Sequence, residues 1–118
     1  MLLRILLMIV LIVLAVQAAV AAPSAVNYVP LDITQVTTGG SAVNAWAAGH
    51  RLGGGWIVNP STATAPLCIN EVGTATTTAQ GNTTCIAPGT SYTLSPSANA
   101  LSVNSTDGPH PFSGMAYQ

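Results

Sequence analysis

The sequence is poor in charged residues. Only 4% of its 118 residues are charged: two arginines, three acidic residues and no lysine, for a formal net charge of −1. A typical soluble domain is about one quarter charged. Two arginines cannot neutralise a run of phosphates, so the composition excludes a nucleic acid partner bound through a basic patch. A hydrophobic content of 49% also excludes a disordered chain kept open by its own charge.

Groups that carry acid–base chemistry are equally scarce. The histidines are His50 and His110, and the acidic residues are Asp32, Glu71 and Asp107. A catalytic triad would need one histidine beside a serine and an acid, and the abundant serines do not indicate which one. A metal site of both histidines with Asp107 is conceivable, but no HxH or HExxH spacing supports it. The sequence therefore predicts loop or packing histidines, no catalytic residue, no metal and no cofactor.

The first residues have the order of a secretory signal peptide. Arg4 provides the positive start, Ile5–Val16 is an unbroken apolar run, and Ala19–Ala21 is a small-residue cleavage pattern. This order predicts cleavage after Ala21, which leaves one domain from residue 22 to 118. The alternative is an uncleaved anchor of residues 5–22, close to the shortest length that spans a membrane. The predicted location is secreted or periplasmic, with the membrane contacted only through this segment if it is retained.

Two cysteines, Cys68 and Cys85, fall in the part expected outside the cytoplasm. An even pair in a small exported domain predicts one disulfide; two buried free thiols are the alternative. Closing a loop of this size contributes on the order of 3 kcal/mol to stability. The spacing fits neither a CxxC redox motif nor a zinc site, which would need further ligands nearby.

Short runs of β-branched and aromatic residues alternate with glycine and proline turns after residue 22, and no helical period is sustained. Pro88-Gly89 suits the central positions of a type II turn. Strands at this spacing predict an all-β fold, a small antiparallel β-sandwich or barrel of about seven to eight short strands. The candidate strands are Ile33–Thr38, Ala42–Ala47, Gly55–Asn59, Leu67–Val72, Thr83–Ala87, Ser91–Ser95, Ala100–Asn104 and Phe112–Tyr117.

The few aromatic residues have two interpretations, because a small domain needs them in its core and a sugar can stack on them at a surface. The Gly-Trp-Ile-Val context favours the core for Trp56. For Trp46 the two interpretations stay open. Trp46 and Tyr92 are therefore the candidate ligand contacts of a glycan-binding surface, with Tyr28 and Tyr117 as further members.

Several phrases recur in order from Val36 onward: Val36–Ala42, Gly54–Pro60, Ala87–Ser91, Val103–Thr106 and His110–Gly114. This ordered set resembles small accessory proteins encoded by tailed phages and prophages. The resemblance covers about 80 residues and implies a compact β-sandwich that serves as a structural module on a capsid or tail. It brings no catalytic residues. The predicted signal peptide departs from the pattern, since virion proteins assemble in the cytoplasm.

Together these observations predict an exported, non-enzymatic structural or interaction module related to phages. The alternative is a secreted carbohydrate- or surface-binding module that uses exposed aromatic side chains. Charged residues commonly guard the edge strands of a sheet, so their scarcity also predicts self-association or docking on a protein partner.

Overall fold

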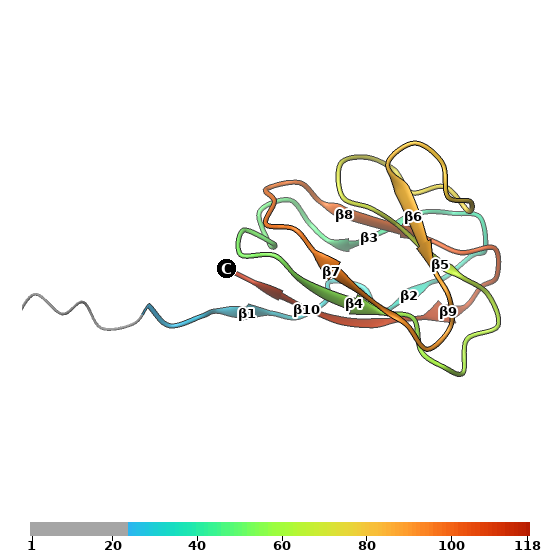
Figure 1. Ribbon diagram of the computed structural model, residues 1–118, viewed down its shortest axis with the longest axis horizontal. Helices are drawn as coiled ribbons and strands as arrows, with labels where there is room; N and C mark the ends of the chain where they lie inside the picture. Colours follow the sequence, from blue (N-terminus) through green and yellow to red (C-terminus); the bar gives the residue numbers. More distant parts are fainter. Residues whose placement is uncertain (1–23) are drawn as a thin grey trace, which may run out of the picture.

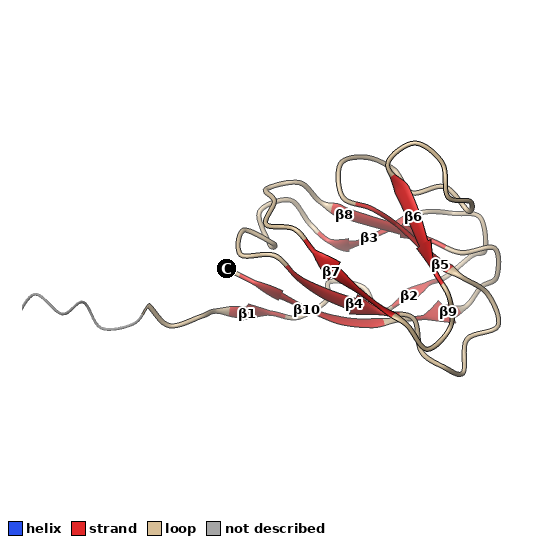
Figure 2. Ribbon diagram, viewed as in Figure 1, coloured by secondary structure: helices blue, strands red, loops and turns tan. Residues whose placement is uncertain are grey.

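The computed structural model describes residues 24–118 and shows an all-β chain in which these residues form no helix (Figures 1 and 2). Its strands are β1 (Tyr28–Val29), β2 (Gln35–Val36), β3 (Val43–Trp46), β4 (Gly55–Val58), β5 (Leu67–Asn70), β6 (Thr83–Ile86), β7 (Ser91–Leu94), β8 (Leu101–Asn104), β9 (His110–Pro111) and β10 (Ser113–Tyr117). The predicted signal segment lies outside the described residues. Within 24–118 there is no helix of the length and hydropathy needed to cross a membrane.

The strands form two four-stranded layers and a short two-stranded sheet (Figure 1). One layer has the order β1-β10-β4-β7 and the other β3-β8-β5-β6, with every pair antiparallel. β2 pairs with β9 toward the end of the sandwich away from the C-terminus (Figure 1). The predicted all-β sandwich is confirmed.

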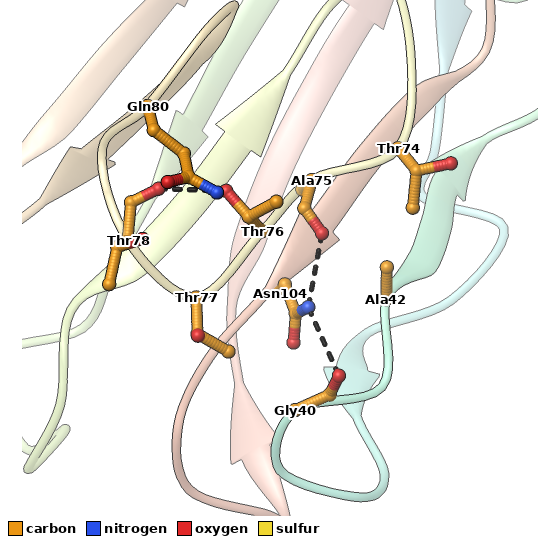
Figure 3. A pocket seen from close by; sticks show the side chains of 9 residues that line it. All are labelled: Gly40, Ala42, Thr74, Ala75, Thr76, Thr77, Thr78, Gln80 and Asn104. Carbon is orange, nitrogen blue, oxygen red and sulfur yellow. Dashed lines mark hydrogen bonds between the residues drawn. The ribbon is translucent and has the colours of Figure 1, made fainter.

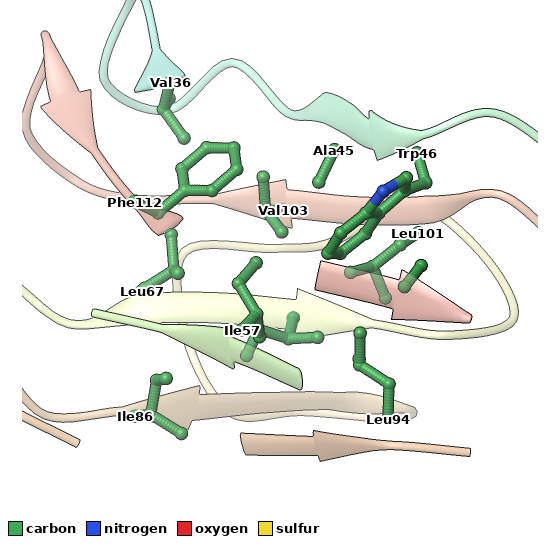
Figure 4. Close-up of a cluster of buried hydrophobic side chains, with 12 residues drawn as sticks. Val36, Ala45, Trp46, Ile57, Leu67, Ile86, Leu94, Leu101, Val103 and Phe112 are labelled. Atoms are coloured by element: carbon green, nitrogen blue, oxygen red, sulfur yellow. The ribbon is translucent and has the colours of Figure 1, made fainter. Parts of the chain in front are cut away.

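Alternation along the strands directs apolar side chains between the layers. In β8, Leu101 and Val103 face the core, while β4 contributes Ile57 from the opposite layer (Figure 4). Apolar burial of this kind stabilises by about 25 cal/mol per Å² of surface removed from water. The core consists of Val36, Ala45, Trp46, Ile57, Leu67, Ile69, Ile86, Leu94, Leu101, Val103, Phe112 and Ala116.

All eight candidate strands overlap an observed strand, and each boundary differs by no more than two residues. The type II turn is also present, because Gly89 has φ +79° and Thr90 N donates to Ala87 O at 3.2 Å. The sequence did not predict β1 and β9, which have only two residues each. Two residues are too few for a period-two pattern, and Pro111 lies in β9.

The four outer strands of the two layers differ in how their edges are covered. The segment before β2 runs along β3, where Asp32 N donates to Ala45 O at 2.9 Å and Asp32 Oδ2 accepts from Ala47 N at 2.6 Å. β1 pairs only with β10, and on the other side β6 and β7 each pair with one neighbour among the described strands. The side formed by β6 and β7, joined by the Ala87–Thr90 turn, therefore presents two free sheet edges.

Candidate functional site

Four polar residues meet at the ring of His110: Asn59 from the end of β4, and Ser105, Asp107 and His110 from the segment between β8 and β9 and the start of β9. We call them the His110 cluster. His110 is 1% exposed. Its Nδ1 lies 2.6 Å from Asp107 Oδ1 and 3.1 Å from Ser105 Oγ. On the far side of the ring, Nε2 lies 3.0 Å from Asn59 Oδ1.

The hydrogen-bond partners define the roles of these atoms. Asn59 Nδ2 donates to Ala65 O at 3.1 Å and to Ile86 O at 3.0 Å, so Asn59 Oδ1 is free to accept from Nε2. The Asp107 carboxylate accepts at Nδ1. An acceptor oxygen therefore lies beside each of the two ring nitrogens.

The carboxylate of Asp107 is stabilised by several donors. Thr64 Oγ1 donates to Oδ2 at 2.6 Å, and Ser105 Oγ donates to Oδ1 at 2.7 Å. These hydrogen bonds, first Thr64 and then Ser105, lower the pKa of Asp107 to about 2 from its ordinary value of 3.8, and the His110 ring adds to the effect.

The His110 cluster has the residue types of a hydrolase triad but a different arrangement. In a triad the acid and the serine contact opposite nitrogens of the histidine. Here Ser105 and Asp107 both lie at Nδ1, and Nε2 is occupied by Asn59. Ser105 is fully buried. The geometry instead connects the segment before β9 to the end of β4, which makes it a structural cross-link.

A second buried polar group joins the two layers on their other side. Arg51 is fully buried, and its Nη1 donates to Glu71 Oε2 at 2.9 Å and to Ser95 O at 3.0 Å. Glu71 also accepts from Ser95 N at 3.0 Å and from the Tyr92 hydroxyl at 3.3 Å. Burial, and next the charge of Glu71, raise the pKa of Tyr92.

The remaining histidine lies apart from this chemistry. His50 Nδ1 is 3.1 Å from Asp32 Oδ2, and both side chains are more than one third exposed. Asp32 is not a member of the His110 cluster, so the two histidines have different acidic partners. Among residues 24–118 no three or more His, Cys, Asp or Glu side chains are grouped as metal ligands would be.

The structure corrects the interpretation of the tryptophans. Trp46, a candidate ligand contact, is fully buried, and its indole Nε1 donates to Pro30 O at 2.8 Å; Figure 4 shows its ring among core side chains. A sugar therefore cannot reach it in this fold. Trp56, predicted to be a core residue, is only partly buried, because Gly55 and Ile57 occupy the inward positions of β4.

The tyrosines have more access to solvent than Trp46. Tyr92, the other candidate contact, is partly buried against the core. Tyr28 is 66% exposed, and its ring meets that of Tyr117 edge to face at 5.7 Å between centroids. These two rings line a cavity of about 450 Å³ with Val26, Gly53 and Gln118.

The predicted disulfide is confirmed. Cys68 and Cys85 are bonded and lie directly opposite each other in the β5–β6 pair. The bond closes the base of the loop that connects these strands. A disulfide in a chain with no free cysteine among the described residues fits an oxidising compartment.

Sequence reasoning did not single out four buried polar side chains beside this disulfide: Asn70, Thr83, Ser102 and Asn104, each at most 7% exposed. The alternation of β8 does separate them from the core: Leu101 and Val103 point into the core, and the polar Ser102 and Asn104 point to the opposite face. Alternation alone predicts that such residues face water. The loop that follows β5 covers them instead.

Comparison with known proteins gives no relative from which a function follows: no family model, no curated protein and no solved structure matches this chain.

Proposed function

We propose that this chain is an exported, non-enzymatic structural module of phage or prophage origin that docks through the β6–β7 side of its sandwich. The observation that carries the proposal is the pair of free edges on that side. β6 pairs only with β5, and β7 only with β4, among the described strands. A free edge offers a row of backbone N–H and C=O groups to an added strand.

The composition of these edges favours docking. Sheet edges are commonly protected by charged residues, proline or bulges. From residue 72 to 106 the sequence contains no Asp, Glu, Lys, Arg or His, and this stretch includes all of β6 and β7. Thr84, Ser91 and Thr93 are exposed there. Their hydroxyl groups are hydrated but carry no charge, so they do not repel a second strand.

Two further observations support the origin and the location. The ordered phrases that resemble phage accessory proteins include Gly54–Pro60, which forms β4 at the centre of its layer, and Ala87–Ser91, which forms the turn between the free edges. The Cys68–Cys85 disulfide agrees with export by the predicted signal peptide. Ser105 is fully buried and His110 is 1% exposed, so the His110 cluster presents no open reaction site.

The simplest partner for a free edge is the same edge of a second copy, so self-association is the first form to test. We expect sedimentation equilibrium of the exported chain to show a concentration-dependent dimer or larger assembly. Thr84→Lys on β6 and Thr93→Lys on β7 place a charge on each edge and should shift the chain to monomer. Thr38→Lys, at an exposed site away from these edges, is the matched control.

A clean monomer at all concentrations contradicts edge docking between copies, as does association that Thr38→Lys weakens as much as the edge variants do. The mass of the exported product tests export separately, because a product that retains residues 1–21 contradicts the predicted cleavage. Phage head or tail genes next to the coding sequence would support the virion role. Trp46 is fully buried and therefore offers a sugar no stacking surface.

A further inference from the structure

A second surface of the sandwich carries a cavity of about 390 Å³, which we call the threonine cavity (Figure 3). It lies between the loop that follows β5 and the turn before β3, with the Asn104 side chain between the two walls (Figure 3). It is separate from the free edges and from the tyrosine-lined cavity. Its lining consists of Gly40, Ala42, Thr74 to Thr78, Gln80 and Asn104.

The loop of the threonine cavity lies on the outer face of the β3-β8-β5-β6 layer, which contributes Asn104 to the lining. Register places Cys85, Cys68 and Asn104 in one row across three strands. Thr83, Asn70 and Ser102 form the adjacent row. Both rows face away from the core, so the disulfide and four neutral polar side chains lie under the loop.

Those four side chains hold the loop through its backbone. Asn104 Nδ2 donates to Ala75 O at 3.1 Å and, on the opposite wall, to Gly40 O at 3.4 Å. Ser102 Oγ accepts from Ala75 N at 3.0 Å. Because these anchors are buried and paired, the cavity is formed before any ligand arrives, which lowers the entropic cost of binding.

The same anchoring continues along the loop. Thr83 Oγ1 accepts from Thr76 N at 3.3 Å, and Asn70 Nδ2 donates to Thr74 O at 3.2 Å. The Cys68–Cys85 bond fixes the strands from which the loop departs. A connection with no secondary structure of its own is thus held at successive residues.

The lining has one chemical character. Threonine hydroxyls and the Gln80 amide are neutral groups that both donate and accept hydrogen bonds, and none of the lining residues is charged. A charged ligand would lose water without gaining an opposite charge, and an apolar ligand would bury hydroxyls without partners. A neutral molecule dense in hydroxyl groups satisfies the same donors and acceptors.

We propose that the threonine cavity binds one sugar residue of a neutral glycan. Thr77 is half-buried, while Thr78 and Gln80 are exposed at the mouth, so these three side chains contact the sugar hydroxyls. The β-branched threonines have few rotamers to lose. The lining has no aromatic ring, so hydrogen bonds alone hold the ligand and the Kd is on the order of 1 mM.

The test is a titration of the ¹⁵N-labelled exported chain with glucose and with N-acetylglucosamine, followed by amide chemical shifts. Saturable shifts are expected at residues 74–80 and at Gly40. Glucuronic acid, in which a carboxylate replaces the C6 hydroxymethyl group of glucose, should bind more weakly than glucose. Shifts that do not saturate, that centre on Tyr28 and Tyr117, or that favour glucuronic acid would overturn the proposal.

Variants assign the contacts. Thr77→Val and Thr78→Val keep the side-chain shape and remove one hydroxyl each, and each should weaken glucose binding about 3- to 10-fold. Thr93→Val, the same change on exposed β7, should leave the affinity unchanged. Equal affinity in all three variants would overturn the proposal. The edge variants Thr84→Lys and Thr93→Lys retain sugar binding, so failure of edge docking and failure of this site give different results.

Discussion

Asn59 connects three parts of the sandwich through the ring of His110. Its Oδ1 lies 3.0 Å from His110 Nε2, while its Nδ2 donates to the carbonyls of Ala65 and Ile86. Asn59 is fully buried, so the ring nitrogen and the two carbonyl groups depend on its side chain for their hydrogen bonds. One side chain at the end of β4 thereby fixes β9, the end of β6 and the segment before β5.

Asn59→Ala should be strongly destabilising, because two carbonyl groups and one ring nitrogen lose their partner in a site without water access. An unsatisfied buried polar group costs about 1 to 3 kcal/mol, and we expect a total loss of about 3 kcal/mol. Urea unfolding of the protein measures it. Asn44→Ala, on an exposed position of β3, is the control and should change the free energy of unfolding by less than about 0.5 kcal/mol.

The Asp107 carboxyl should make the domain less stable in acid. Its pKa is lowered to about 2 in the fold from 3.8, so between these values the unfolded chain binds more protons and stability falls as the pH decreases. Asp107→Asn should flatten this part of a plot of free energy of unfolding against pH. An unchanged slope in that variant would contradict the role given to Asp107.

Thr64 provides an independent check on the same carboxyl, since its hydroxyl is the largest cause of the lowered pKa. Thr64→Val should move the acid transition toward higher pH while leaving the His110 ring paired with Asp107. The measurement is thermal unfolding across the acidic range. A transition that does not move would show that Thr64 does not stabilise the charged carboxyl.

Gly114 should tolerate no side chain, because β10 passes directly beneath the Trp46 ring. A Cβ at Gly114 would lie 2.7 Å from Trp56 O and 2.8 Å from the Cη2 atom of Trp46. Gly114→Ala should therefore cost about 2 kcal/mol through overpacking. Gly73→Ala, where the nearest atom is a side-chain nitrogen 3.8 Å away, should fold with nearly unchanged stability.

Removal of the disulfide tests both stability and the threonine cavity. Cys68→Ala/Cys85→Ala should lower the free energy of unfolding by about 3 kcal/mol, since the bond closes a loop with a sequence separation of 17. Hydrogen exchange should become faster at residues 74–80. Titration of the denatured, unreduced wild-type chain should find no thiol, and two reactive thiols would contradict the bond.

The strand pattern was predictable because each strand is a short β-branched or aromatic run between glycine and proline turns. The facing of the tryptophans was not. The pairing of β3 with β8 shifts register between Asn44 and Trp46, and this irregularity places both Ala45 and Trp46 inside. A bulge of this kind depends on the partner strand, which a local pattern does not contain.

The polar clusters were less predictable for a different reason. Ser105, Asp107 and His110 are close in sequence, but Asn59, which occupies the other ring nitrogen, is 51 residues from His110. Likewise Arg51 reaches Glu71 and Ser95 only after both layers have formed. The residue types were visible in the sequence; their partners were set by the packing of one layer on the other.

The pairing of β1 with β10 joins the first and the last strand of the described chain. β10 is an inner strand of its layer and lies between β1 and β4. In the short sheet, β2 has β9 as its partner, which also comes late in the sequence. β5 and β6 are neighbours in sequence and can pair with each other directly, but β1 and one side of β4 have no partner until residues 113–117 join the sheet. The layer β1-β10-β4-β7 is therefore complete only once its last strand in the sequence has paired on both sides.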